Sequence, residues 1–127
     1  EVAERLSAAA ALVQCATEEF GIASVEAQAA GRPVIALAAG GALETVVEGK
    51  TGVLFENADV EMLTQAVSEF DPVRFSADDC RNNAEHFSVA AFAEGLKSAI
   101  SDLPSVPSAP RERCRERRRG LWRPPLA

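Results

Sequence analysis

The sequence has no uninterrupted apolar run of eighteen residues, so it contains no segment typical of a membrane-spanning helix. Its first residues, Glu1 to Glu4, lack the basic region and apolar core of a secretory signal peptide. The three cysteines, Cys15, Cys80 and Cys114, are odd in number and widely spaced, which argues against a disulfide framework or a zinc site. These absences favour a cytoplasmic protein with reduced thiols.

Basic residues are scarce in residues 1–102, which contain 6 Lys or Arg and 17 Asp or Glu, a net charge of −11. Residues 103–127 reverse this balance with 7 Arg and 2 Glu, a net charge of +5. The acidic body disfavours nucleic acid as a partner, because phosphate contacts dominate that affinity. We therefore expect a globular part, 1–102, and a Pro/Arg-rich disordered tail, 103–127.

The basic tail has two interpretations. Its clustered Arg side chains and Trp122 would suit a weak contact with an anionic membrane surface. The plainer alternative is a solvated or non-native tail with no role, and we favour it because short basic runs are weak signals.

Three apolar runs, at 11–15, 34–37 and 53–55, predict short buried strands in a single small domain. Helices are predicted between and after them, at 1–10, 23–30, 42–47, 57–70, 77–86 and 89–101. This alternation predicts an α/β fold with a partial Rossmann-like parallel sheet, followed by C-terminal helices. The run Val34–Leu37 is uniformly apolar, which suits a parallel strand covered on both faces.

The two last helices have start signals. Ser76, with an acidic residue three positions later, resembles a capping box. Ser88 is expected to cap the final helix, in which Phe92, Leu96 and Ile100 recur at helical spacing and predict a buried stripe.

The segment from Glu18 to Gly31 crosses from the first strand to the second. Phe20-Gly21 predicts a turn in which glycine allows a ligand close to the backbone. The residues from Ala23 onward are mostly good helix formers, and Gly31 is a natural stop. Ligands of open α/β sheets bind at the carboxyl edge, where the helix N-terminus favours anions.

Two carboxylates, Glu18 and Glu26, frame this crossing with seven residues between them. A carboxylate is a suitable acceptor for hydroxyl groups, so a pair flanking an anion site would suit a nucleotide-sugar. On spacing alone, a solvated loop and an exposed helix face are the simpler interpretation in an acidic chain.

Four motifs follow one another along the chain: Glu18-x-Phe20-Gly21 with Glu26-Ala27, then Ala30-Gly31-x-Pro33-Val34-Ile35-Ala36, then Gly40-Gly41-x-x-Glu44-x-Val46, then Gly49-x-Thr51-Gly52-x-Leu54-Phe55. In this order and spacing they resemble the C-terminal domain of glycosyltransferase family 4, whose members are retaining enzymes of the GT-B fold. The resemblance covers about residues 1–100 and is most similar to the bacterial mannosyltransferase branch. It makes a ligand role the preferred interpretation of the two glutamates.

The resemblance implies a hexosyltransferase that needs no metal or cofactor and uses a nucleotide-sugar donor, with GDP-mannose as the expected one. In the family, the glutamate that corresponds to Glu18 is the catalytic carboxylate and contacts the donor sugar. The glutamate that corresponds to Glu26 binds the ribose of the nucleotide. The other donor-binding residues expected are Phe20, Gly21, Ile22, Val25, Gly40 and Gly41. The glycine pair could equally be a plain loop after a strand. The chain has no Asp-x-Asp metal motif.

The chain has no counterpart of two parts of the family pattern. One is an upstream segment whose Arg and Lys grip the pyrophosphate, and the other is the N-terminal domain that binds a glycan or lipid-linked acceptor. We therefore expect a fragment, inactive alone, of a cytoplasmic enzyme that could sit peripherally at the inner face of the membrane. The open alternatives are a non-catalytic nucleotide-binding or interaction module and an inactive remnant. A receiver-like signalling domain is disfavoured because no predicted strand ends in Asp.

Overall fold

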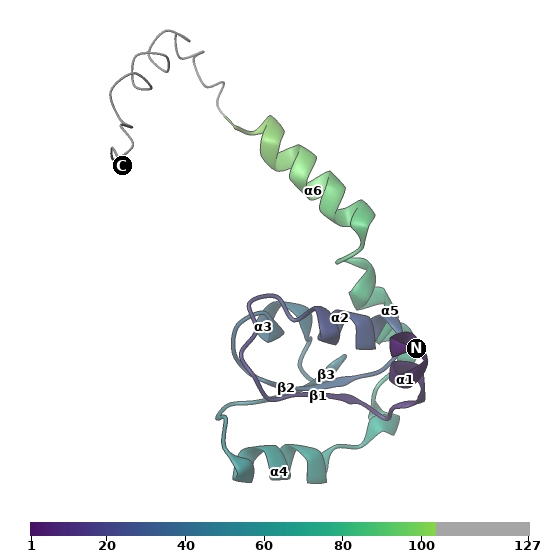
Figure 1. Cartoon of the computed structure of the whole chain (residues 1–127), viewed down its shortest axis with the longest axis vertical. Helices are drawn as coiled ribbons and strands as arrows, with labels where there is room; N and C mark the ends of the chain where they lie inside the picture. Colours follow the sequence, from purple (N-terminus) through teal and green to yellow (C-terminus); the bar gives the residue numbers. More distant parts are fainter. Residues whose placement is uncertain (104–127) are drawn as a thin grey trace, which may run out of the picture. The chain divides into compact units, whose positions relative to one another are not determined.

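The computed structural model describes residues 1–103, which include a three-stranded parallel sheet with helices on both faces (Figure 1). The elements, in chain order, are α1 (Val2–Ala8), β1 (Leu12–Gln14), α2 (Ile22–Ala29), β2 (Val34–Leu37), α3 (Ala42–Thr45), β3 (Gly52–Phe55), α4 (Val60–Glu69), the 3-10 helix η1 (Pro72–Arg74), α5 (Ala77–Glu85) and α6 (Val89–Ser101). This order confirms the predicted α/β class and its partial parallel sheet. The predicted helices are present with slightly different ends, and η1 was not predicted.

The strands lie in the order β1-β2-β3 and all run parallel. Leu12 pairs with Val34 across β1 and β2, and Val34 pairs with Gly52 across β2 and β3. Because the strands share one direction, their carboxyl ends meet at one edge of the sheet. The loops that follow β1 and β2 are therefore neighbours at that edge.

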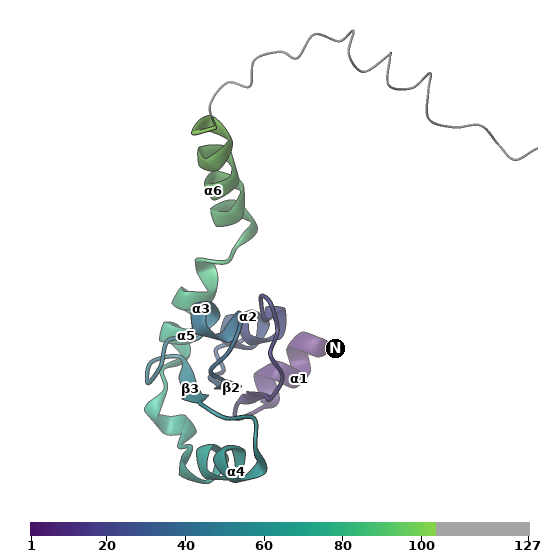
Figure 2. The same cartoon turned by 90° about the vertical axis from the view of Figure 1, so that its left-hand side faces the viewer.

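The sheet separates two apolar cores. Val34 and Ala36 of β2 pack with residues of α2 and α3, whereas Ile35 and Leu37 pack with residues of β3 and α4. Figure 2 shows α4 on one side of the sheet and α2 and α3 on the other. All four residues of β2 are buried, which confirms the prediction of a parallel strand covered on both faces.

Side-chain caps begin α4, α5 and α6. Asp59 Oδ1 accepts a hydrogen bond from the Met62 amide at 2.7 Å. Ser76 Oγ accepts from the amide two residues later at 3.2 Å, and Ser88 Oγ accepts from the amide three residues later at 3.2 Å. The predicted capping roles of Ser76 and Ser88 are thus confirmed, because each hydroxyl satisfies an amide that the helix leaves free.

The predicted buried stripe of the last helix is wrong. Phe92 is 69% exposed, Leu96 is 48% exposed and Ile100 is 58% exposed, and α6 has no buried residue. Local spacing predicts which side chains share a helix face, but burial also needs a partner surface, which spacing does not specify. Tertiary contacts also divide the chain into a unit Glu1–Gly95 and a second unit that begins at Leu96.

The Arg-rich tail, with its predicted disorder and membrane contact, lies outside the described residues, apart from Leu103. The predicted boundary after residue 102 stays a prediction. None of the helices in residues 1–103 is long and apolar enough to cross a membrane.

Candidate functional site

The predicted site residues gather at the carboxyl edge of the sheet. Glu18 and Phe20 lie on the loop between β1 and α2, and Gly21 is the N-cap residue immediately before α2. Gly40 and Gly41 lie on the loop between β2 and α3. Neighbouring parallel strands bring these two loops together, although they are some twenty positions apart in the sequence.

The two loops are in direct backbone contact. The N–H of Gly41 donates to the carbonyl oxygen of Glu18 at 2.7 Å. A Cβ atom added to Gly40 would overlap that same oxygen, and one added to Gly41 would overlap the carbonyl of Phe20. Gly40 also has a φ of +57°, a conformation that residues with side chains rarely adopt. The packing of the two loops therefore requires the glycine pair, independently of any ligand.

Helix α2 begins without a side-chain cap. Its N-cap is Gly21, with a φ of +81°, and the Gly21 carbonyl accepts from the amides of Ser24 at 3.0 Å and Val25 at 3.4 Å. Ile22, the first helical residue, is 62% exposed, and no acidic residue lies in the first turn. An uncapped helix start carries partial positive charge and presents free amides, so this end of α2 is suited to an anion.

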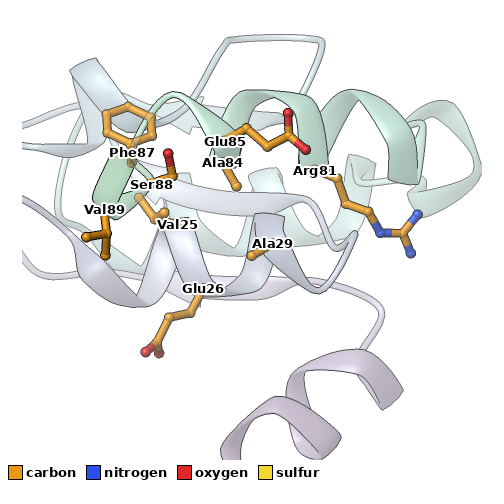
Figure 3. A pocket seen from close by; sticks show the side chains of 9 residues that line it. All are labelled: Val25, Glu26, Ala29, Arg81, Ala84, Glu85, Phe87, Ser88 and Val89. Carbon is orange, nitrogen blue, oxygen red and sulfur yellow. The ribbon is translucent and has the colours of Figure 1, made fainter. Parts of the chain in front are cut away.

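The two predicted carboxylates are both exposed. Glu18 lies on the loop before α2, and Glu26 lies about one turn into the helix. Figure 3 shows the Glu26 side chain extending away from the α5 side chains Arg81 and Glu85. Within residues 1–103 neither Glu18 nor Glu26 forms an ion pair, so both carboxylates can accept hydrogen bonds from hydroxyl groups.

A pocket of about 470 Å³ lies between α2 and α5 (Figure 3). Val25 and Glu26 line it from α2, and Arg81 and Phe87 line it from α5 and the turn that follows. The ring of Phe20 packs edge-on against Phe87, with the ring centroids 5.8 Å apart. The structure thus places Val25 and Glu26 on a concave surface, whereas the other predicted site residues lie outside its lining.

A polar network beneath the loops was missed by the sequence analysis. Its members, which are joined by side-chain hydrogen bonds, are Gln14, Ser24, Gln28, Thr45 and Asn83. Ser24, Gln28 and Thr45 are fully buried. One signal was available, because Ser24 and Gln28 are four residues apart and so share a helix face with the core residue Ala27. Polar side chains on a buried face need partners, which the sequence does not identify.

Among residues 1–103, no three His, Cys, Asp or Glu side chains lie close enough together to hold a metal ion. The expectation of chemistry without a metal or cofactor stays a prediction.

Residues 1–87 match the model of the protein family described as "Glycosyl transferases group 1". The chain is 36% identical over 93 residues to a D-inositol 3-phosphate glycosyltransferase of Corynebacterium aurimucosum, covering 70% of this chain and 22% of that protein. It is 47% identical over 62 residues to a GDP-mannose-dependent alpha-(1-6)-phosphatidylinositol monomannoside mannosyltransferase of Mycolicibacterium smegmatis, covering 47% of this chain and 16% of that protein. The chain thus spans about a quarter or less of the length of these relatives.

Two solved structures have a similar fold. Sucrose-phosphate synthase from Thermosynechococcus elongatus superposes with a TM-score of 0.68 and 32% identity, over 76% of this chain and 26% of that one. The Anabaena protein Alr3699/HepE, in complex with UDP and glucose, superposes with a TM-score of 0.61 and 29% identity, over 80% of this chain and 30% of that one.

Proposed function

The chain belongs to the glycosyl transferases group 1 family, and on that premise we propose that it is the donor-binding part of a retaining hexosyltransferase. The observation that carries the proposal is the contact of two loops around an uncapped helix start. The Gly41 amide donates to the Glu18 carbonyl at 2.7 Å, so the loop after β2 supports the Glu18 loop, which leads directly into α2. Hydroxyl acceptors on both sides of an anion-binding helix start match a sugar, a diphosphate and a ribose joined in series.

Each candidate residue has a role in this proposal. The Glu18 carboxylate accepts hydrogen bonds from hydroxyls of the donor sugar, and the Glu26 carboxylate accepts from the ribose. The backbone amides at Phe20, Gly21 and Ile22 line the sugar and the diphosphate. Val25, which lines the pocket, and the Gly40-Gly41 turn, which supports the Glu18 loop, complete the donor site.

The proposed reaction transfers a hexosyl group with retention at the anomeric carbon. The bond from that carbon to the diphosphate oxygen breaks, and a bond to an acceptor hydroxyl oxygen forms. The acceptor proton leaves with the nucleoside diphosphate. The partial positive charge at the start of α2 offsets part of the charge that develops on the diphosphate, which is why the proposal requires no metal.

We take GDP-mannose as the donor and a glycan or lipid-linked molecule as the acceptor. The Mycolicibacterium smegmatis relative is GDP-mannose-dependent by its name and acts on a phosphatidylinositol mannoside. Structures of the Anabaena protein contain UDP or UDP-glucose, so the experiment below compares GDP with UDP. The acceptor would be bound by parts of a longer protein.

The test is an amide NMR titration of the 127-residue chain with GDP, UDP and ADP in turn. The proposal expects shifts at residues 20–26 and at Gly40 and Gly41, with GDP binding most tightly. A dispersed spectrum that no nucleotide perturbs would contradict donor binding by this chain. Binding without transfer by the enzyme that contains this sequence would instead favour a non-catalytic nucleotide-binding module.

A further inference from the structure

The carbonyl oxygen of Thr45, the last residue of α3, is held by two amide side chains from other helices. Gln28 Nε2 of α2 donates to it at 2.8 Å, and Asn83 Nδ2 of α5 donates to it at 2.9 Å. The two amides are also joined to each other, because Asn83 Nδ2 donates to Gln28 Oε1 at 2.6 Å. Gln28 and Thr45 are fully buried, so their polar groups need hydrogen-bond partners within the protein.

Thr45 also forms hydrogen bonds with Gly41, at the N-terminal end of α3. Thr45 Oγ1 donates to the carbonyl of Gly41 at 2.8 Å, and the Thr45 amide donates to that carbonyl at 2.9 Å. Helix α3 has only four residues, too few to be stable by its own hydrogen bonds. Its position is therefore set by contacts at its ends, and its first end is the glycine that bonds to the Glu18 carbonyl.

We propose that Asn83 and Gln28 are positioning residues of the donor site, which act through Thr45 and Gly41 to hold the Glu18 loop in place. A continuous path of hydrogen bonds leads from α5 to the backbone of Glu18, and each link is between 2.6 and 2.9 Å long. The side chain of Asn83 donates to Gln28 and Thr45, neither of which is among the donor-binding residues assigned above. This inference rests on the proposed function, because it assigns the two residues to the same site.

The experiment compares Asn83→Ala with Asn82→Ala in the 127-residue chain. Asn82 is the exposed neighbour on the same helix and takes part in none of the hydrogen bonds above. Two quantities are measured, the hydrogen-exchange rate of the Gly41 amide and the affinity for GDP and UDP. Loss of the Asn83 amide is expected to speed Gly41 exchange about tenfold and to weaken nucleotide binding about fivefold. Asn82→Ala is expected to leave both unchanged.

A second variant covers the case in which Asn83→Ala unfolds. Thr45→Val keeps the shape of the side chain but removes the hydroxyl link to Gly41, and Thr45→Ser should restore it. A role in stability alone would lower the Tm of these variants and leave Gly41 exchange and nucleotide affinity at wild-type values, which would overturn the inference. If the wild-type chain binds no nucleotide, the proposed function fails, whereas Gly41 exchange still decides whether Asn83 and Thr45 position the loop.

Discussion

The N–H of Gly41 donates a hydrogen bond to the carbonyl oxygen of Glu18 at 2.7 Å, so the loop after β2 supports the loop after β1. There is no room for a side chain between them, because a Cβ atom on either Gly40 or Gly41 would overlap the backbone of residues 18–20. The candidate site is therefore a property of two loops packed together, and its integrity can be tested at the glycines as well as at the carboxylates.

The first prediction concerns Gly41→Ala. The φ of Gly41 is −63°, which alanine adopts easily, so any cost must come from overlap with the Phe20 carbonyl. We expect a loss of about 2 kcal/mol in the free energy of unfolding and weaker nucleotide binding. Chemical denaturation measures the first and an NMR titration the second. The matched control is Gly95→Ala in α6, where an added Cβ has no neighbour within 4 Å and should stabilise by about 0.5–1 kcal/mol. Equal effects of the two substitutions would contradict the overlap argument.

The second prediction compares two glycines with positive φ. Gly40, at +57°, faces the Glu18 carbonyl, whereas Gly49, at +71°, has open space around it. Gly49→Ala should cost only the left-handed strain, about 1–2 kcal/mol, with nucleotide affinity unchanged. Gly40→Ala adds a backbone overlap to that strain and should cost clearly more in urea denaturation. The idea fails if Gly40→Ala is the milder of the two.

The third prediction concerns Glu26→Ala. Glu26 is exposed on α2 and forms no ion pair within residues 1–103, so its removal should leave the free energy of unfolding within about 0.5 kcal/mol. Loss of a charged acceptor for ribose hydroxyls should weaken nucleotide binding about tenfold. Isothermal titration calorimetry with GDP measures the change. Glu69→Ala, on the opposite face of the sheet, serves as the control and should bind like the wild type. Wild-type affinity in Glu26→Ala would count against its assigned role.

The fourth prediction concerns the buried thiol of Cys80. Burial raises the pKa of Cys80 above its ordinary value of 9.0, and the neighbouring Asp79 charge raises it further. The folded chain should therefore keep this thiol protonated and unreactive to iodoacetamide at pH 8, whereas the exposed Cys15 should react. Because the pKa of Cys80 is higher in the folded chain, the stability that its protonated thiol contributes is fully present below pH 9.0. That stability is lost as the pH rises through the pKa of the folded chain. Peptide mass spectrometry measures the labelling at Cys15 and Cys80, and urea should make both of these thiols reactive. Equal labelling of both in the native chain would contradict the burial of Cys80.

The fifth prediction contrasts two apolar side chains. Ile35 is 2% exposed in the centre of the sheet, so Ile35→Ala should cost about 2–5 kcal/mol in thermal or chemical denaturation. Phe92 is 69% exposed on α6, and Phe92→Ala should change stability by less than about 0.5 kcal/mol. A large loss of stability in Phe92→Ala would show that its ring is covered in solution.

Local chemistry made much of this protein predictable from its sequence. The apolar run Val34–Leu37 could only suit a strand buried on both faces, and the structure places it there. Hydroxyl groups at Ser76 and Ser88 marked the starts of two helices, since a side-chain acceptor next to free amides is a short-range signal. The spacing of Glu18 and Glu26 likewise placed one carboxylate before a helix and the other one turn into it.

Contacts between distant residues were decided only by the tertiary structure. The pairing of Gly41 with Glu18 and the joining of Gln28 to Asn83 connect segments far apart in the chain, and no local pattern specifies such partners. The apolar stripe of α6 has the same limit, because periodicity defines an apolar helix face but does not specify a surface that covers it. Burial and hydrogen-bond partners are properties of the assembled layers, whereas helix starts, strand runs and motif spacing are properties of neighbouring residues.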